Sequence, residues 1–399
     1  MGASPRDTLR RAVLLAAIAL LAASPAQAKT AFEPVASDLD FPTNMAFAPD
    51  GRIFFTERDT GNIRVIEDGE LLPEPFATLG VIPGGGELGE TGLLGIALHP
   101  SFPEEPWVYA YFSSAEDQRN RLVRIKAEGN TGTRIDTLAR LLPAVSAYHN
   151  GGDMAFGPDA KLYVTAGEAH DADLAQDPNN PGGKVLRYNA DGSVPGDNPF
   201  GKGNPVYSMG HRNSFGICFD PATGTLWETE NGPSSDDEVN QIVAGGNYGW
   251  PIVLGRGDDP DFINPVLDFP QTIAPTGCAV WKGTMYFGDF LGRLHRVRQA
   301  GNAFRDAIEA SFQAGITDVA VGTDGDMYVA TSRSIERVRE STSNGSSPVA
   351  SPSANPAASP EEPSPGSEPR IPIGLIALVV AAGLAAAVVI LWRYWRAKP

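Results

Sequence analysis

A short pattern of two strands recurs six times along the chain, and this repeat constrains the fold more than any other feature. Each copy has an alternating apolar strand, a turn containing Asp-Gly or a related pair, and a second strand rich in Tyr, Phe, Val and Thr. The turn needs residues that tolerate positive φ, which is why Gly, Asp and Asn occur in it. A period of about 40 to 60 residues is typical of propeller blades and not of helical repeats. The copies begin at Met45, Leu94, Met154, Gly216, Cys278 and Val319.

Most copies are followed by a third apolar strand with a basic residue near its centre. These strands begin at Asn62, Arg121, Lys184, Arg293 and Ser334. The pattern predicts an all-β fold, a six-bladed β-propeller whose four-stranded blades surround a central channel. A β-sandwich is the competing fold, and the regularity of the repeat argues against it. We expect the extended segment Ala31–Ala36 to complete the sixth blade, so that the two ends of the domain meet.

The two ends of the chain have the composition of targeting and anchoring segments. Arginines precede an apolar run, and Ala26-Gln27-Ala28 then offers the small-x-small pattern of a signal-peptidase site, although an uncleaved anchor is the alternative. Near the other end, 371–392 contains no charged residue and basic residues follow it, which predicts one transmembrane helix with the propeller outside the cytoplasm. The predicted parts are a signal peptide (1–28), the propeller (31–339), a Ser/Pro-rich disordered stalk (340–370), the transmembrane helix (371–392) and a cytoplasmic tail (393–399).

Charge and cysteine content narrow the chemistry. The net charge is -17, and the absence of a basic run outside the termini makes nucleic acid an improbable partner. Cys218 and Cys278 occupy similar positions in two repeats and lie in apolar, strand-like contexts. Outside the cell they could form a disulfide, but we interpret them as two buried free thiols.

Three insertions carry the candidate functional residues. His149 stands before a glycine pair and is a candidate general base, with Glu168 in the same repeat as the carboxylate that orients it. Arg212 and Asn213 are suited to a carboxylate or quinone oxygen, although a salt bridge that only anchors the loop is the plainer interpretation. The acidic segment 230–238 offers backbone carbonyls and carboxylates for calcium, or is simply a solvated turn.

These loops, in this order on a six-bladed repeat, resemble the glucose/sorbosone dehydrogenase family, which includes the soluble glucose dehydrogenases and aldose sugar dehydrogenases. The resemblance covers roughly residues 41–339. Its motifs are Gly92-Leu-Leu-Gly-Ile-Ala-Leu-His-Pro, His149-Asn-Gly-Gly, Gly183-Lys-Val-Leu-Arg, Gly210-His-Arg-Asn, Glu230-Asn-Gly-Pro with Asp236-Asp-Glu, and Asn247-Tyr-Gly-Trp-Pro.

The resemblance implies an enzyme that uses pyrroloquinoline quinone (PQQ) and calcium to oxidise the C1 hydroxyl of aldose sugars at the outer face of the membrane, with an external electron acceptor. By motif, His149 would be the base and Glu168 would stand where the family usually has an aspartate. The remaining roles also follow by motif. The expected cofactor contacts are Glu90, Arg212 and Asn213, and the expected calcium residues are Gly232, Pro233 and Asp237.

The chain departs from the family pattern on one side of the site. Ser214 and Phe215 replace the usual Pro-Gln, and Glu90 stands where a glutamine is common. After the second strand of the fifth repeat the family's lysine is missing, and 315–318 lacks the arginines found before the sixth inner strand. Because these cations hold the acidic groups of the cofactor, we expect weaker cofactor binding.

Two other functions remain open. A non-catalytic propeller that binds a ligand or a protein would keep the fold and lose the cofactor, as in animal relatives of the family. A hydrolase such as a lactonase would need calcium ligands from side chains along the channel, and the sequence does not assemble that pattern.

Overall fold

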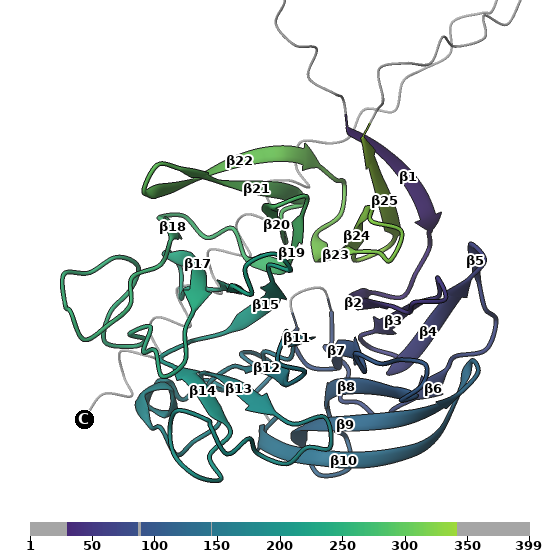
Figure 1. Ribbon diagram of the computed structural model, residues 1–399, viewed down its shortest axis with the longest axis horizontal. Coiled ribbons are helices and arrows are strands. Elements are labelled where there is room, and N and C mark those ends of the chain that lie inside the picture. The colour runs from purple at the N-terminus through teal and green to yellow at the C-terminus, as the bar shows by residue number, and fades with distance from the viewer. Residues whose placement is uncertain (1–29, 87–88, 145, 341–399) are drawn as a thin grey trace, which may run out of the picture. The chain divides into compact units, whose positions relative to one another are not determined.

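The computed structural model describes residues 30–86, 89–144 and 146–340. Their strands form six antiparallel sheets around a central axis, visible as the ring of strands in Figure 1. The innermost strands of neighbouring blades contact one another around the whole ring. The predicted all-β six-bladed propeller is therefore confirmed.

Each blade is a sheet whose strands follow one another in sequence from the axis outward, except where the ring closes. Blade 1 contains β2 (Pro42–Phe47), β3 (Ile53–Glu57), β4 (Asn62–Glu67), β5 (Glu70–Leu71) and β6 (Ala77–Thr78), and blade 2 contains β7 (Leu93–Leu98), β8 (Trp107–Ser113), β9 (Arg119–Glu128) and β10 (Thr131–Pro143). Blade 3 contains β11 (Met154–Phe156), β12 (Leu162–Ala166), β13 (Lys184–Tyr188) and β14 (Val206–Met209), and blade 4 contains β15 (Ser214–Phe219), β16 (Leu226–Glu230), β17 (Asp237–Ile242) and β18 (Leu267–Phe269). Blade 5 contains β19 (Pro275–Trp281), β20 (Thr284–Asp289), β21 (Arg293–Ala300) and β22 (Ala303–Ser311).

Blade 6 is built from both ends of the propeller. It contains β23 (Ile316–Val321), β24 (Met327–Thr331), β25 (Ile335–Glu340) and β1 (Thr30–Ala36). β1 pairs antiparallel with β25, and Figure 1 shows these first and last strands side by side. The predicted closure of the ring by the segment before the first repeat is therefore confirmed.

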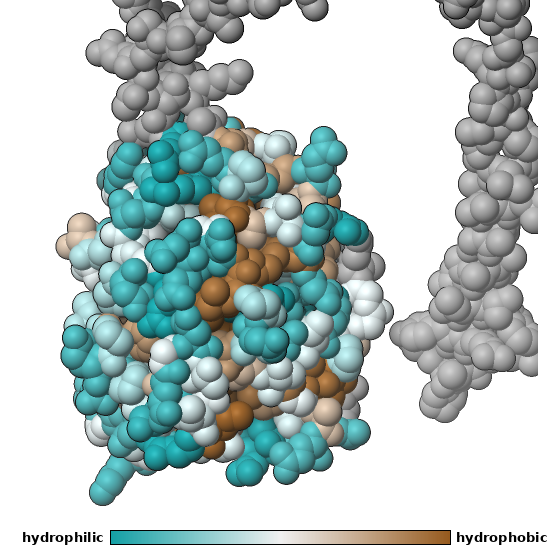
Figure 2. Space-filling view, turned by 90° about the vertical axis from the view of Figure 1, so that its right-hand side faces the viewer, coloured by the Kyte–Doolittle hydropathy of each residue, from teal (hydrophilic) through white to brown (hydrophobic). Residues whose placement is uncertain are grey.

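The hydrophobic core lies between the blades, because each sheet packs a face against the next one. Between blades 1 and 2, for example, Phe54 and Val65 meet Ile96 and Val108, and all four are fully or almost fully buried. Side chains along a strand alternate between the two faces of its sheet, and the apolar ones pack between the blades, although strands near the site such as β17 also bury several polar side chains. Figure 2 shows that the side of the ring is mostly hydrophilic, with a narrow hydrophobic band across it.

Several predicted parts lie outside the described residues. These are the signal peptide, the transmembrane helix, the cytoplasmic tail and the stalk apart from its first residue. In the described part of the chain, no helix has the length and apolar character needed to span a membrane.

The prediction of two free thiols is wrong. Cys218 on β15 and Cys278 on β19 form a disulfide, with their Cα atoms 5.7 Å apart. The two residues occupy matching positions on the inner strands of adjacent blades, which brings their Cα atoms within the range that a disulfide spans. The bond joins blade 4 to blade 5.

Candidate functional site

The connection between blades 2 and 3 holds the candidate base in an unusual backbone conformation. His149 has φ 59°, in the left-handed region that residues with a side chain rarely adopt. Its side chain is buried, although it belongs to a loop. Gly151 and Gly152 follow with positive φ, and a Cβ at Gly152 would collide with Tyr111 and Leu94. The glycine pair therefore lets this loop pass close to blade 2, and the strained backbone marks a candidate functional position.

Glu168 holds the imidazole of His149 from the loop that follows β12. The His149 Nδ1 atom lies 2.6 Å from Glu168 Oε2, and both side chains are buried. The loop itself is fixed by Lys184, whose ammonium donates hydrogen bonds to the carbonyls of Leu174, Ala175 and Gly182. Leu174 and Ala175 belong to the short 3-10 helix η1 (Ala172–Gln176).

Glu90, in the connection between blades 1 and 2, links the base to blade 4. Its Oε2 atom accepts a hydrogen bond of 2.5 Å from the backbone N–H of His149 and one of 3.0 Å from Asn213 Nδ2. Asn213 Oδ1 in turn accepts the backbone N–H of Gly151 at 3.3 Å. Burial raises the pKa of Glu90 to about 7, although the hydrogen bonds from His149 and Asn213 oppose this shift.

Arg212 and the predicted calcium loop are bonded to each other. Arg212 Nη1 donates to the carbonyls of Asn231 and Gly232, both at 2.9 Å. The backbone N–H of Gly232 donates to Asp237 Oδ1 at 2.8 Å, and Asp237 Oδ2 accepts the N–H groups of Ile273 and Ala274. Asp237 therefore supports the loop, and the Gly232 carbonyl is already engaged by a cation.

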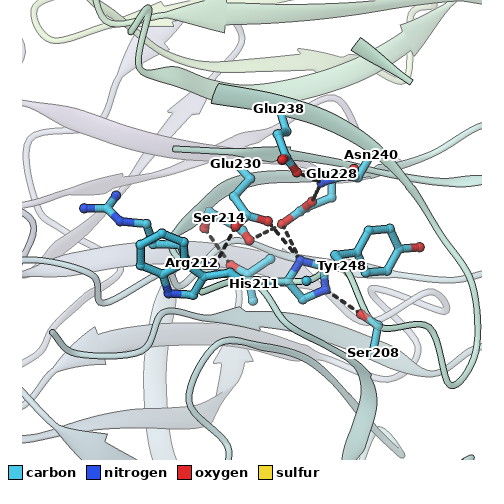
Figure 3. Close-up of polar contacts among 12 residues, drawn as sticks. Ser208, His211, Arg212, Ser214, Glu228, Glu230, Glu238, Asn240 and Tyr248 are labelled. Atoms are coloured by element: carbon cyan, nitrogen blue, oxygen red, sulfur yellow. Dashed lines mark hydrogen bonds and ion pairs between the residues drawn. The ribbon is translucent and has the colours of Figure 1, made fainter. Parts of the chain in front are cut away.

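A buried polar network lies behind Arg212 (Figure 3). Glu230 joins the two parts, because its Oε1 accepts the backbone N–H of Arg212 at 2.5 Å and its Oε2 lies 3.0 Å from His211 Nδ1. His211 Nε2 lies 2.8 Å from the Ser208 hydroxyl, and the imidazole stacks on the ring of Tyr248. This network fixes the backbone from which Arg212 and Asn213 project.

The pKa values of the titratable groups in the network are shifted in different directions. Burial alone would lower the pKa of His211, but the adjacent Glu228 and Glu230 raise it to about 10. Burial and the neighbouring Glu228 raise the pKa of Glu230 to about 7, and burial and Glu230 raise the pKa of Glu238 well above its ordinary value. The nitrogen and carboxylate atoms of His211, Glu228 and Glu230 lie within 4.8 Å of one another, as metal ligands would. These carboxyl oxygens already accept hydrogen bonds from Ser214, Asn240, Arg212 and His211, so the cluster needs no ion.

A cavity of about 190 Å³ opens at the mouth of the channel, and of the eight predicted site residues only Glu90 is among the described residues that line it. Glu90 and Gly151 line its blade 3 side, and Phe41 and Phe290 line the opposite side with ring centroids 6.3 Å apart. Arg58 is the only cation among the described residues of its wall, and its guanidinium is paired with Asp59 and stacked on Phe41.

On the side of blades 5 and 6, the described residues of the cavity wall include no lysine or arginine, as the departures from the family pattern predict. Arg293, the first cation after β20, donates to Asp289 from both its backbone N–H and its Nε. It is absent from the described residues that line the cavity, whereas the side chains of Phe290, Thr276 and Thr317 are present. Aromatic rings and hydroxyl groups thus stand where cations are expected.

The residues of this region fit calcium and PQQ, the two groups that the resemblance implies, to different degrees. The carbonyls of Gly232 and Pro233 are oxygen donors of the kind that calcium prefers, whereas both carboxylate oxygens of Asp237 already accept backbone N–H groups and hold the loop. The cavity offers flat aromatic rings at Phe41 and Phe290 for a planar quinone, and the hydroxyl oxygen of Thr317 is buried without a hydrogen-bond partner. The cavity wall offers little positive charge to balance the three carboxylates of PQQ, because Arg58, the one cation among its described residues, is paired with Asp59.

Seven of the eight predicted site residues belong to one hydrogen-bonded region. The exception is Pro233, whose side chain is exposed and for which the structure gives no contact. Thr317, Phe41 and Phe290 were missed as site residues. The signal for Thr317 was its equivalence to Thr43 and Thr276 in the repeat, because residues at equal positions of a propeller face the same part of the channel. Phe41 gave no such signal, because it precedes the repeat.

Known proteins similar to the chain share this architecture. The family described as Glucose / Sorbosone dehydrogenase matches residues 39–339. Quinoprotein glucose dehydrogenase B of Acinetobacter calcoaceticus is 34% identical over 57% of this chain and 54% of its own length, and aldose sugar dehydrogenase YliI of Escherichia coli is 30% identical over 76% and 90%. The PQQ-bound aldose sugar dehydrogenase of Streptomyces coelicolor is 33% identical, with a TM-score of 0.69 over 78% of this chain and 98% of that one.

Proposed function

The chain belongs to the glucose/sorbosone dehydrogenase family, and we propose that it is a PQQ- and calcium-dependent dehydrogenase of aldose sugars. The observation that carries the proposal is the buried pair of His149 and Glu168, which is joined through Glu90 to the wall of the cavity. Similarity to a PQQ-bound dehydrogenase supports the choice of cofactor.

His149 would act as the general base. Donation from Nδ1–H to Glu168 fixes the tautomer that leaves the lone pair of Nε2 free to accept a proton. The C1 hydroxyl of a cyclic aldose would lose its proton to Nε2 as the hydride leaves C1, and the sugar product would be a lactone. Glu168 would stabilise the imidazolium that forms, so the proton would be held at a position fixed by the protein.

PQQ supplies the acceptor of the hydride when it is bound. Arg212 and Asn213 would hold its quinone side, and Glu90 would contact it from the blade 2 connection. The carbonyls of Gly232 and Pro233 would bind calcium, with Asp237 keeping their loop in place. For Gly232, this requires that Arg212 release or share the carbonyl that it holds.

We also place the reaction outside the cytoplasm. The apolar run 371–392 and the basic residues after it would anchor the chain in the cell membrane by a single span, with the propeller on the extracytoplasmic side. The disulfide between Cys218 and Cys278 supports an oxidising compartment. An external acceptor would then reoxidise the reduced cofactor.

The test is an assay of the full-length protein purified and supplied with calcium and PQQ. We expect PQQ-dependent reduction of an artificial electron acceptor dye with at least one aldose of a panel, and no dye reduction when PQQ is omitted. Failure of every aldose, together with no PQQ binding, would favour the alternative of a propeller that binds a ligand or protein without catalysis.

A further inference from the structure

Equivalent residues of five blades form a ring around the mouth of the channel. Each is the second residue of an inner strand, and side chains alternate along a strand, so all five face the same cavity. They are Thr43, Leu94, Phe215, Thr276 and Thr317, and all five line the cavity. Three adjacent blades, 5, 6 and 1, thus contribute a threonine.

The three threonines differ in how their hydroxyl groups are satisfied. Thr43 donates to the Leu93 carbonyl at 2.8 Å, and Thr276 donates to the Ile316 carbonyl at 2.9 Å. In both cases the acceptor lies on the inner strand of the next blade. Thr317 is also buried, yet its Oγ1 has no hydrogen-bond partner among the described residues.

A buried hydroxyl without a partner costs the folded protein free energy. The cost arises because nothing in the described part of the chain replaces the hydrogen bonds that the hydroxyl group makes to water in the unfolded chain. A ligand oxygen in the cavity would remove this cost on binding. Because Oγ1 is buried in this rotamer, reaching such a ligand would involve rotation about the Cα–Cβ bond of Thr317, which moves the hydroxyl group among the staggered positions.

The position of Thr317 distinguishes the cofactor from the sugar. Blade 6 lies directly across the ring from blade 3, whose loops hold His149 and Glu168. The sugar hydroxyl that reacts must lie at His149. Phe290 of blade 5 and Phe41 before blade 1 flank the blade 6 side and offer flat apolar surface rather than groups that bind sugar hydroxyls. A planar group packed there would present its polar edge to Thr317.

We propose that Thr317 binds the quinone cofactor, donating a hydrogen bond from Oγ1 to a carboxylate or carbonyl oxygen at the edge of the ring system. This inference rests on the proposed function. It assigns a neutral hydroxyl to the side of the cavity where the family pattern leads one to expect arginine. Cofactor binding by this chain would then use a hydrogen bond from a neutral hydroxyl group where the family pattern uses the positive charge of arginine.

The experiment compares Thr317→Val with Thr276→Val in the full-length protein. Each change replaces a hydroxyl by a methyl group of nearly the same shape at the same position of neighbouring blades. PQQ is titrated in the presence of calcium, and binding is followed by quenching of tryptophan fluorescence without any sugar. We expect Kd to rise about ten-fold in T317V, as the loss of a hydrogen bond to a charged group predicts, and to rise much less in T276V, whose hydroxyl group already bonds the Ile316 carbonyl.

The two variants should rank differently in melting temperature when PQQ is absent, with T276V the more destabilised. T317V removes a hydroxyl that has no partner, so its melting temperature should equal or exceed that of the wild type. T276V breaks an internal hydrogen bond and should melt lower. Thr317→Ser keeps the hydroxyl and should keep the affinity for PQQ.

The outcomes separate this inference from the proposed function. Saturable binding of PQQ by the wild type with an unchanged Kd in T317V overturns the role of Thr317 and leaves the proposed function intact. An unchanged Kd for PQQ with a raised KM for the aldose in T317V would show that the hydroxyl group contacts the sugar, and this also overturns the inference. No binding by the wild type at micromolar PQQ overturns both.

Discussion

The two halves of the channel mouth are built from the same repeat but satisfy their polar groups in opposite ways. On the side of blades 3 and 4, each candidate side chain except Pro233 is held by another polar group, from Glu168 through His149 and Glu90 to Asn213. On the side of blades 5, 6 and 1, the cavity wall has aromatic rings and threonines, and its one described cation, Arg58, is paired with Asp59. Under the proposed function, the first half would take up the proton, whereas the second would pack against the ligand and hydrogen-bond it.

The contrast shows how a propeller divides its functions. Inner strands fix six equivalent positions by the geometry of the ring, and the loops between them are free to differ. Here the loops of blades 3 and 4 are long and strained, whereas the connection from β20 to β21 is a short turn at Phe290–Gly292. The short turn also buries a charged group with its partners, because Asp289 is bonded by Arg293 and His295. Only the connections of blade 3 hold the candidate pair of His149 and Glu168.

The largest effect is expected from His149→Ala. Removing the base should lower the rate of aldose oxidation by about 10²–10⁴-fold, whereas PQQ affinity should change little, because the imidazole acts on the sugar. Steady-state kinetics with saturating PQQ measures the rate, and a fluorescence titration measures the affinity. His99→Ala, on a hairpin of the opposite face of the ring, is the control. Full activity in H149A would show that the base lies elsewhere.

The disulfide joins the two halves, and its removal should affect stability rather than chemistry. Replacing both Cys218 and Cys278 by alanine frees a loop with a sequence separation of 60 residues. The free energy of unfolding should fall by about 2–4 kcal/mol, because the unfolded chain gains conformational freedom. Urea unfolding with and without a reducing agent checks this prediction. Equal stability of the oxidised wild type and the double variant would contradict it.

Adding a cation to the second half should strengthen PQQ binding. Leu291 is 64% exposed beside Phe290, so Leu291→Lys adds a charge near the cavity without disturbing the core. PQQ should bind about ten-fold more tightly at low salt, because a hydrogen bond from an ammonium to a carboxylate is stronger than one between neutral groups. The gain should shrink at high salt, where exposed charges are screened. Leu291→Gln is the neutral control, and an equal gain in that variant would exclude charge as the cause.

The smallest effect concerns pH and Glu90. Its pKa is raised from 4.5 to about 7, so the folded protein holds the proton more tightly than the unfolded chain. The stability that Glu90 contributes is therefore fully present below its unfolded pKa and is lost as the pH rises from about 4.5 to 7. Glu90→Gln should flatten this decline in melting temperature, whereas the exposed Glu105→Gln should not. Parallel curves for E90Q and the wild type would contradict the burial of a titrating carboxyl group.

The sequence predicted the fold because the repeat records a local regularity. Alternating strands and Asp-Gly turns are visible over a few residues, and even the closing strand β1 follows from the need to complete blade 6. Candidate residues such as His149 and Glu168 were identifiable because their motifs lie in loops that interrupt the repeat.

Pairings across blades could not be predicted in the same way. The bond between Cys218 and Cys278 depends on the distance between two inner strands, which the spacing along the chain does not give. Nor does the sequence reveal that Arg212 holds the Gly232 carbonyl, or that Thr276 is satisfied and Thr317 is not. These differences depend on the orientation of a single carbonyl or hydroxyl group.

One measurement tests the account most directly, namely a titration of the full-length protein with PQQ in the presence of calcium at low and at high salt. We expect saturable binding with Kd in the roughly micromolar range. Affinity should fall only modestly at high salt, because the side of blades 5, 6 and 1 offers few cations whose attraction salt could screen. Addition of an aldose should then consume the bound oxidised quinone in the wild type and not in H149A. No saturable binding at either salt concentration would contradict the account.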